Sequence, residues 1–292
     1  MTAALPSAPL LALLSAFFFG LSTVAVQPGL RYTDSATGTA ISTGAGALAF
    51  WVTAPLYLEP AHWHSPAVPW FLLGGMFRPF LTVNLLYAGA RLMGPTITGT
   101  VASSSPLFSA AFAVLILGER LPLPVGLGTV AVVVGLMALS WRGQAERRWP
   151  LRALLFPFGA ALLRGIVHPI NKHGIGLLPN PFVAGLSAYT VSFALTVVNA
   201  WWWRPPGGPR LGWRALAWFS GMGLSSTTAN LLLFTAFRTG DVVHLVPIVA
   251  SAPVFTMLLS WLFLRGEEQL GPRVVAGVFL VVPGVILVNL YR

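Results

Sequence analysis

The chain has 292 residues, no cysteine, a formal net charge of +10, 56% hydrophobic residues and 8% charged residues. A soluble protein of this length carries roughly a quarter charged residues, so these few charges cannot cover a surface that faces water. The composition therefore excludes a soluble protein and disulfide chemistry, predicts an integral membrane protein, and assigns the excess of Arg to lipid headgroups and membrane topology in place of nucleic-acid binding.

Ten apolar stretches follow one another along the chain, each long enough to cross about 30 Å of hydrocarbon. Met1 to Pro9 contains no Lys or Arg, so we expect the first stretch to be a retained span and not a cleaved signal peptide. The sequence thus predicts an all-α polytopic membrane protein with ten transmembrane helices. The stretches lie near residues 8–27, 36–57, 67–90, 95–117, 121–140, 152–172, 182–203, 213–236, 242–264 and 272–291.

Short motifs of the first half return in the second half, 146 to 149 residues later. We therefore divide the chain into two five-helix repeats, residues 1–145 and 146–292. Because five is odd, the second repeat enters the membrane from the opposite side, which predicts inverted repeats around a central cavity. The recurring residues are Asn84-Leu85-Leu86 with Asn230-Leu231-Leu232, Gly94 with Gly240, Ser104-x-Pro106-x-Phe108 with Ser251-x-Pro253-x-Phe255, Gly118-Glu119 with Gly266-Glu267, and Gly128 and Gly135 with Gly277 and Gly284.

Arg78 and Arg164 lie well inside the third and sixth expected spans. An Arg near the bilayer centre costs at least about 2.5–3.5 kcal/mol on insertion scales, so each is expected to face a cavity or a partner. One interpretation is a guanidinium that receives the carboxylate of a substrate. The alternative is an Arg that snorkels to an interface, or that bonds backbone carbonyls exposed by Pro79 or Pro169.

The fourth and ninth expected spans each contain a proline beside small hydroxyl residues. Proline removes a backbone donor and bends a helix, so Pro106 and Pro253 predict two matched hinges at one cavity. The hydroxyls of Ser104, Ser105 and Ser251 can satisfy the freed carbonyls or bind the substrate. Hinge geometry is the favoured interpretation.

Other polar side chains in or near the spans are candidates for lining the cavity. Asn84 and Asn230 occupy equivalent places, and Tyr87 lies about one turn beyond Asn84 on the same face. Amides that join helices are the ordinary alternative. His168 and His244 could carry a proton linked to transport, although a buried, hydrogen-bonded imidazole is the preferred interpretation.

No Asp or Glu lies deep in any expected span: Asp241 stands at a helix start, and Glu119 and Glu267 stand at helix ends. This disfavours an exporter of organic cations and favours a zwitterionic or weakly anionic solute. No catalytic Asp pair, His-Glu-x-x-His motif, Ser-His arrangement or phosphate-binding Gly-x-x-x-x-Gly-Lys motif occurs. We therefore expect no enzyme, no catalytic residue, no cofactor and no metal ion, and an intramembrane enzyme remains the alternative from another class.

Together and in this order, these residues resemble the drug/metabolite transporter (DMT) superfamily, EamA type, over essentially the whole chain. The resemblance rests on the Gly-Glu pairs that close the fourth and ninth spans, the proline in each of those spans, and Gly20 with Gln27 echoed by Gly165 with Lys172. Within this family the chain is most similar to amino-acid exporters of the YddG type.

The resemblance implies a secondary-active exporter of amino acids, with hydrophobic or aromatic ones favoured, that works by alternating access. It also implies a cavity lined chiefly by spans one, three, four, six, eight and nine, and a monomer in the bacterial inner membrane. The expected partners are a small-molecule substrate and the lipid bilayer, and not nucleic acid. The alternative cargo is another small metabolite or a drug.

The side of the membrane that the termini face stays open at this point. On the ten-span topology, both termini lie on one side of the membrane. Eleven Arg lie in the connections on the opposite side, and four Arg or Lys lie on the side of the termini. The positive-inside rule then places both termini outside the cytoplasm. Relatives of the resembled family generally place both termini in the cytoplasm.

Overall fold

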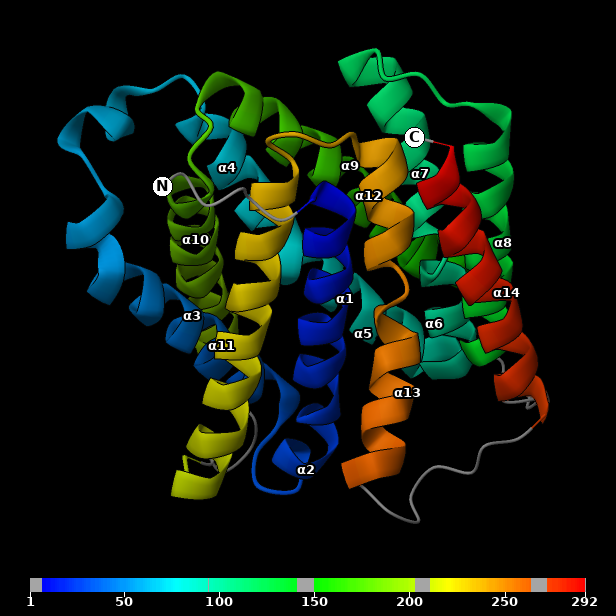
Figure 1. Ribbon diagram of the computed structural model, residues 1–292. Helices are drawn as coiled ribbons and strands as arrows, with labels where there is room; N and C mark the ends of the chain where they lie inside the picture. The colour runs from blue at the N-terminus through cyan, green and yellow to red at the C-terminus, as the bar shows by residue number, and fades with distance from the viewer. Residues whose placement is uncertain (1–6, 94, 141–149, 203–210, 264–271, 292) are drawn as a thin grey trace.

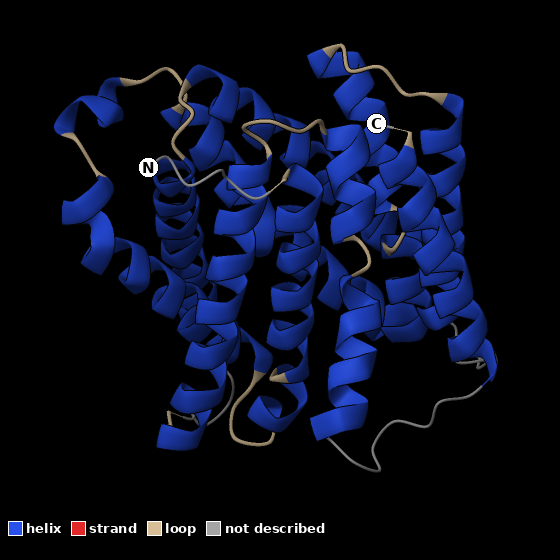
Figure 2. Cartoon of the chain, in the orientation of Figure 1, coloured by secondary structure: helices blue, strands red, loops and turns tan. Residues whose placement is uncertain are grey.

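The computed structural model describes residues 7–93, 95–140, 150–202, 211–263 and 272–291. Within these residues every regular element is a helix and no strand occurs (Figure 2). The helices lie roughly side by side in one bundle (Figure 1). The predicted all-α polytopic architecture is confirmed at this level.

The helices of the first half divide several of the expected spans into shorter pieces. They are α1 (Ala8–Val24), α2 (Val26–Leu30), α3 (Ser35–Tyr57), the short 3-10 helix η1 (Pro60–His64), α4 (Val68–Gly75), the π-helical turn η2 (Met76–Leu81), α5 (Thr82–Met93), α6 (Pro95–Ala102), α7 (Ser105–Phe112), the π-helical turn η3 (Ala113–Leu117) and α8 (Leu123–Ser140).

The second half contains fewer and longer helices. They are the 3-10 helix η4 (Leu151–Leu154), α9 (Leu155–Leu177), α10 (Pro181–Trp202), α11 (Trp213–Ala236), α12 (Val242–Val249), α13 (Ala252–Phe263) and α14 (Pro272–Leu290).

Among the described residues, seven helical stretches are long and apolar enough to cross a membrane. The other three expected spans correspond to α8 and α14, whose apolar parts are shorter, and to α11, which is 24 residues long but contains the polar run Ser225–Thr228. Length and composition therefore support seven of the ten expected spans, and the full count of ten stays a prediction. The seven are Ala8–Leu30, Ser35–Tyr57, Val68–Met93, Ile97–Leu117, Leu151–Leu177, Pro181–Trp202 and Val242–Leu262.

Large apolar side chains cover the outside of the bundle. Leu56, Leu115 and Phe279 are 76%, 79% and 72% exposed. Water would not solvate such a surface, and lipid would. The outer surface therefore agrees with a protein embedded in a bilayer.

The third expected span is broken at Arg78. The backbone of Arg78 is extended, with φ −135° and ψ 127°, between α4 and α5. The ring of a proline disfavours the helical conformation of the residue before it, so Pro79 accounts for this break. The helical conformation is therefore interrupted at Arg78, the charged residue in the interior of the third expected span.

The fourth and ninth expected spans are broken at equivalent places. α6 ends at Ala102 before α7 begins at Ser105, and α12 ends at Val249 before α13 begins at Ala252. Pro106 and Pro253 stand in the first turn of the helices that follow, where a missing N–H costs no hydrogen bond. The matched breaks therefore follow from the repeated Ser-x-Pro motif.

Helices of the two halves pack against each other through glycines. A Cβ atom placed on Gly20 of α1 would lie 2.7 Å from Cβ of Phe255 on α13, and one on Gly165 of α9 would lie 2.5 Å from Cβ of Phe108 on α7. Gly20 and Gly165 are equivalent in the repeat, as are Phe255 and Phe108. The same contact is thus made twice, once with each half supplying the glycine.

α8 and α14 form a seam of two glycine pairs. A Cβ atom on Gly128 or Gly135 would lie 2.8 Å from the carbonyl oxygen of Gly284 or Gly277, respectively. This pairing requires antiparallel helices. α1 and α11 also lie side by side with opposite chain directions (Figure 1).

Candidate functional site

A cavity of ≈ 780 Å³ lies between the two halves. Its walls come from α1, α2, the start of α3, the broken segment α4–η2–α5, and helices α9, α10 and α11. These are the expected spans one, two, three, six, seven and eight. The described cavity takes no lining from spans four and nine, which the family resemblance had implied, and takes lining from spans two and seven, which it had not.

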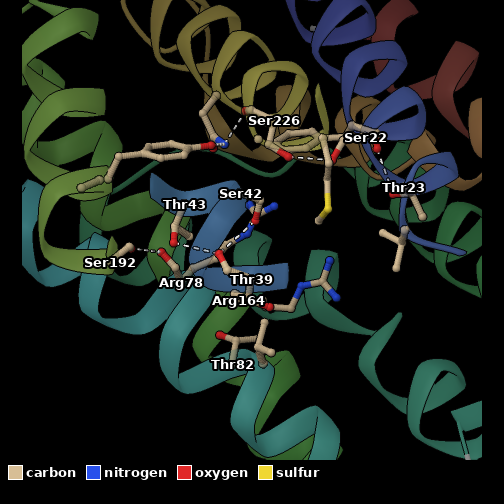
Figure 3. Close-up of a pocket in the computed structure, with 18 of the residues that line it drawn as sticks. Ser22, Thr23, Thr39, Ser42, Thr43, Arg78, Thr82, Arg164, Ser192 and Ser226 are labelled. Carbon is tan, nitrogen blue, oxygen red and sulfur yellow. Dashed lines mark hydrogen bonds between the residues drawn. The ribbon is translucent and has the colours of Figure 1, made fainter. Parts of the chain in front are cut away.

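Arg78 and Arg164 both line this cavity and are partly exposed to it (Figure 3). Cζ of Arg78 lies 5.0 Å from the centroid of the Phe19 ring. In the part of the chain that the structure describes, no ion pair or hydrogen bond engages either guanidinium. Two cationic groups in one cavity are therefore available to a ligand.

The break at Arg78 is held by Ser192 of α10. Its hydroxyl donates to the carbonyl oxygen of Gly75 at 2.6 Å and to that of Arg78 at 3.1 Å. These carbonyls lose helical partners where the chain becomes extended, so a side chain from another helix supplies the donor. Ser192 thereby fixes the backbone from which the Arg78 side chain enters the cavity.

The polar residues of α9 reach the cavity because of their spacing. Arg164, His168 and Asn171 are four and three residues apart, which places them on one face of the helix. The His168 ring lies 6.2 Å from the ring of Phe237 in an edge-to-face arrangement. Oδ1 of Asn171 is buried and has no hydrogen-bond partner. This face therefore offers the cavity one charge and one imidazole.

The opposite wall is formed by α10, α11 and α1 through neutral hydrogen bonds. Nδ2 of Asn230 donates to the phenol oxygen of Tyr189 at 3.0 Å and to the carbonyl oxygen of Ser226 at 2.8 Å. The hydroxyls of Ser22 and Ser226 are 2.6 Å apart and join α1 to α11 (Figure 3). This wall can hydrogen-bond a solute without adding charge.

Apolar side chains complete the cavity. Phe19, Leu86, Phe219, Met222 and Phe234 line it together with the polar groups above. Cavities of this kind bind an amphiphilic small molecule, because the aromatic and aliphatic surface takes the body of the ligand while a few polar groups fix its orientation.

Asp34 is the carboxylate that lines the cavity among the described residues, and it lies in the connection between α2 and α3. Its two oxygens accept hydrogen bonds from the backbone N–H of Thr37 at 2.9 Å and from the Thr37 hydroxyl at 2.6 Å. Partial burial raises the pKa of Asp34, but these hydrogen bonds outweigh it and hold the pKa below its ordinary value. The ionised carboxylate therefore serves as the N-cap of α3.

The turn between α11 and α12 is held by two charged side chains, which we call the clasp. Nζ of Lys172 donates to the carbonyl oxygens of Phe237 at 2.8 Å and Gly240 at 2.7 Å. The carboxylate of Glu119 accepts from the backbone N–H groups of Val242 and Val243, each at 2.9 Å. The Lys172 ammonium thus binds free carbonyl oxygens after the end of α11, and the Glu119 carboxylate binds free N–H groups at the start of α12. The dipoles of the two helices favour both placements.

The clasp lies at the end of the bundle where α1 begins. A Cβ atom on Gly240 would lie 2.9 Å from Cβ of Ala8, whereas the α2–α3 connection that lines the cavity lies at the opposite end (Figure 1). Burial raises the pKa of Glu119 above its ordinary value, more than the two N–H donors and Lys172 lower it. Within the clasp, Glu119 joins the first half to α12, and Lys172 joins α9 to the end of α11 within the second half.

Of the residues that the sequence singled out, Arg78, Arg164, His168 and Asn230 meet at the cavity. The others do not contribute to its described lining. Asn84 donates from Nδ2 to the carbonyl oxygen of Phe80 on its own helix, at 2.9 Å. His244 lies in α12, where its Nε2 is buried without a partner. The side chain of Tyr87 lies outside what the structure describes.

The serines of the broken spans bond their own helices. The Ser104 hydroxyl donates to the carbonyl oxygen of Val101 at 2.7 Å, and the Ser251 hydroxyl to that of Ile248 at 2.6 Å. Ser105 begins α7, and neither Pro106 nor Pro253 lines the cavity. The serines and prolines therefore lie at the helix breaks, where a hinge is expected, and they do not line the described cavity.

Several cavity residues were missed by the sequence analysis, notably Ser22, Tyr189, Ser192 and Ser226. Hydroxyl residues are common in membrane helices, so one of them alone carries little signal. The polar run Ser225–Thr228 inside an otherwise apolar stretch was the available signal for Ser226.

Comparison with known proteins gives a family and a fold. The sequence matches the EamA-like transporter family twice, over residues 6–141 and 151–290. A solved crystal structure of another protein superposes with a TM-score of 0.79 at 18% sequence identity, covering 97% of this chain and 96% of that one. Identity this low bears on the fold alone. No curated protein matches the sequence.

Proposed function

The chain belongs to the EamA-like transporter family, and from this premise we propose that it is a secondary-active transporter that exports small carboxylate-bearing solutes, amino acids among them. The family makes it a membrane transporter of small solutes. The observation that supports the cargo is the pair of guanidinium groups, Arg78 and Arg164, that line one cavity without an ion pair or hydrogen bond to any described residue. Guanidinium groups bind carboxylates through paired, charge-assisted hydrogen bonds.

The proposed binding mode follows from the two kinds of wall. The carboxylate of the solute lies between Arg78 and Arg164, and its body lies against Phe19, Phe219 and Phe234. This arrangement favours amino acids with hydrophobic or aromatic side chains, in line with the resemblance to exporters of the YddG type. Another small metabolite or a drug with a carboxylate is the alternative cargo.

The transport cycle we propose is alternating access in two inverted five-helix repeats, residues 1–145 and 146–292. It is supported by the reciprocal contacts of Gly20 and Gly165 and by the equivalent breaks before Pro106 and Pro253. The clasp holds one end of the bundle, and the cavity reaches the connection at the other end. On this proposal the breaks are hinges, and release of the clasp opens the second end.

The membrane we propose is the bacterial inner membrane, with the protein acting as a monomer. If the end that carries the clasp faces the cytoplasm, the described cavity faces outward, and an exported solute enters when the clasp opens. Accessibility of that end in intact cells tests the orientation that charge and family left open.

Flux through purified protein tests the function. The reconstituted full chain in sealed liposomes is screened for uptake and counterflow of labelled amino acids, with protein-free liposomes for leak. We expect saturable flux of one or more apolar amino acids, which Arg78→Gln and Arg164→Gln each lower by about tenfold or more. Arg91→Gln is the matched control, because Arg91 is exposed and does not line the cavity. Folded protein that moves none of the panel would refute the amino-acid assignment.

A further inference from the structure

The charges that face the cavity do not balance. Arg78 and Arg164 are cationic at any physiological pH, and the described lining contains a single carboxylate, Asp34. Both oxygens of Asp34 already accept hydrogen bonds from Thr37 at the start of α3. The other acidic residues of the sequence stand in connections or at span ends: Glu59, Glu119, Glu146, Asp241, Glu267 and Glu268.

The remaining polar groups of the cavity do not restore the balance. His168 is at most one more positive charge, and it shares a helix face with Arg164. Tyr189, Asn230, Ser22 and Ser226 are neutral and largely bonded to one another. With Arg78 and Arg164 positive and Asp34 negative, the described lining of the empty cavity therefore has a net charge of +1, which an anionic solute can neutralise.

An amino acid neutralises this charge poorly. Its ammonium is attached to the same carbon that bears the carboxylate, so a carboxylate held between Arg78 and Arg164 brings the ammonium close to both. Like charges about 6 Å apart at an intermediate dielectric repel strongly enough to weaken binding by about tenfold or more. Apart from Asp34, whose carboxylate caps α3 at the α2–α3 connection, the described lining offers the ammonium only neutral acceptors, such as the hydroxyls of Ser22 and Ser226.

We infer that this cavity selects organic anions whose carboxylate is not balanced by an ammonium, namely 2-hydroxy or 2-oxo acids with an apolar or aromatic body, over amino acids of the same skeleton. The inference rests on the proposed transport function and narrows its substrate class. The apolar walls accept the same body in either case, so the charge beside the carboxylate makes the difference. A 2-hydroxyl can also hydrogen-bond the neutral wall of Ser226 and Asn230.

A matched pair of solutes tests this inference. Phenylalanine and 3-phenyllactate have the same carbon skeleton and differ in an ammonium against a hydroxyl. Calorimetry on the purified full chain in detergent, and counterflow in proteoliposomes at pH 7, give the affinity and the flux of each. We expect 3-phenyllactate to bind at least about tenfold more tightly than phenylalanine. Phenylalanine that binds equally or better overturns the inference and leaves the transport function standing.

Variants separate a charge effect from loss of the fold. Arg164→Gln removes one cation with little change in shape, and we expect it to lower the preference for 3-phenyllactate by about threefold or more, with the melting temperature as a check of folding. Arg91→Gln should keep the wild-type preference. An Arg164→Gln variant that is folded and keeps the full preference would also overturn the inference. Absence of flux for every acid and amino acid would instead refute the proposed function itself.

Discussion

Removal of the Lys172 ammonium should open the clasped end of the bundle. Its Nζ makes two charge-assisted hydrogen bonds, to the carbonyl oxygens of Phe237 and Gly240 at 2.8 and 2.7 Å. Such bonds contribute about 1.5–3 kcal/mol each when buried, and roughly half of that when the group is partly exposed, as Lys172 is. Lys172→Met therefore weakens the clasp by about 1.5–3 kcal/mol, which raises the population opened at that end about 12- to 140-fold.

The absence of native cysteine makes this opening measurable. Leu245 is 1% exposed and lies just below the clasp, so Leu245→Cys provides a single buried thiol. A membrane-impermeant maleimide added from the clasped side should label this thiol at least tenfold faster in the Lys172→Met background, since labelling follows the open population. Lys172→Arg, which keeps the charge and the donors, is the control. Equal rates in the Lys172→Met and parent proteins would show that the clasp does not hold this end closed.

Three further outcomes follow from the contacts of single residues. Gly165→Ala places a methyl group 2.5 Å from α7 and should lower stability by about 1–3 kcal/mol in thermal unfolding, whereas Gly176→Ala, with open space around it, should not. Ser192→Ala leaves two carbonyls at the break without their donor; we expect a loss of about 1–3 kcal/mol and weaker solute binding in calorimetry, and unchanged binding would contradict this role. Asp34→Ala removes the cap of α3 at a cost of about 1 kcal/mol near pH 7. Because the pKa of Asp34 is lowered on folding, the difference in stability between wild type and variant should begin to shrink as the pH falls to about 3.8 and continue to shrink through the lower pKa of the folded protein, and a difference that is the same far below pH 3.8 as at pH 7 would exclude the ionised cap.

The charged part of the site was predictable from sequence because a charge in a membrane span is costly. Arg78 and Arg164 stand out in apolar stretches, and the structure places both at the same cavity. The break at Arg78 was equally accessible, since Pro79 follows it and restricts its backbone. Both features follow from local rules, namely the cost of a charge in a membrane span and the effect of a proline on the residue before it.

The neutral part of the site depends on pairing between distant helices, which no local rule gives. Ser192 bonds carbonyls 114 and 117 residues away, and Ser22 meets Ser226 across 204 residues. The polar run of α11, which lowers the apolar character of the eighth expected span, is satisfied in the same way by tertiary contacts. One of these is the bond of the Ser225 hydroxyl to the carbonyl oxygen of Phe18.

Repeat equivalence located residues better than it assigned their roles. Asn84 and Asn230 hold equivalent places, yet Asn230 bonds Tyr189 at the cavity while Asn84 bonds a carbonyl of its own helix. The cavity is one-sided, with the clasp at one end and the α2–α3 connection at the other, so equivalent residues meet different surroundings. Sequence symmetry alone cannot tell which member of a pair faces the solute in a given conformation.

The seam of α8 and α14 bears on where the molecule can flex. At Gly128, Gly135, Gly277 and Gly284 the two backbones approach so closely that not even one methyl group fits between them, and neither helix contributes to the cavity wall. No side chains separate the two helices at these positions. If one helix moved along the other, a larger side chain would clash with the backbone of its partner. In the proposed transport cycle we therefore expect α8 and α14 to move as one rigid pair.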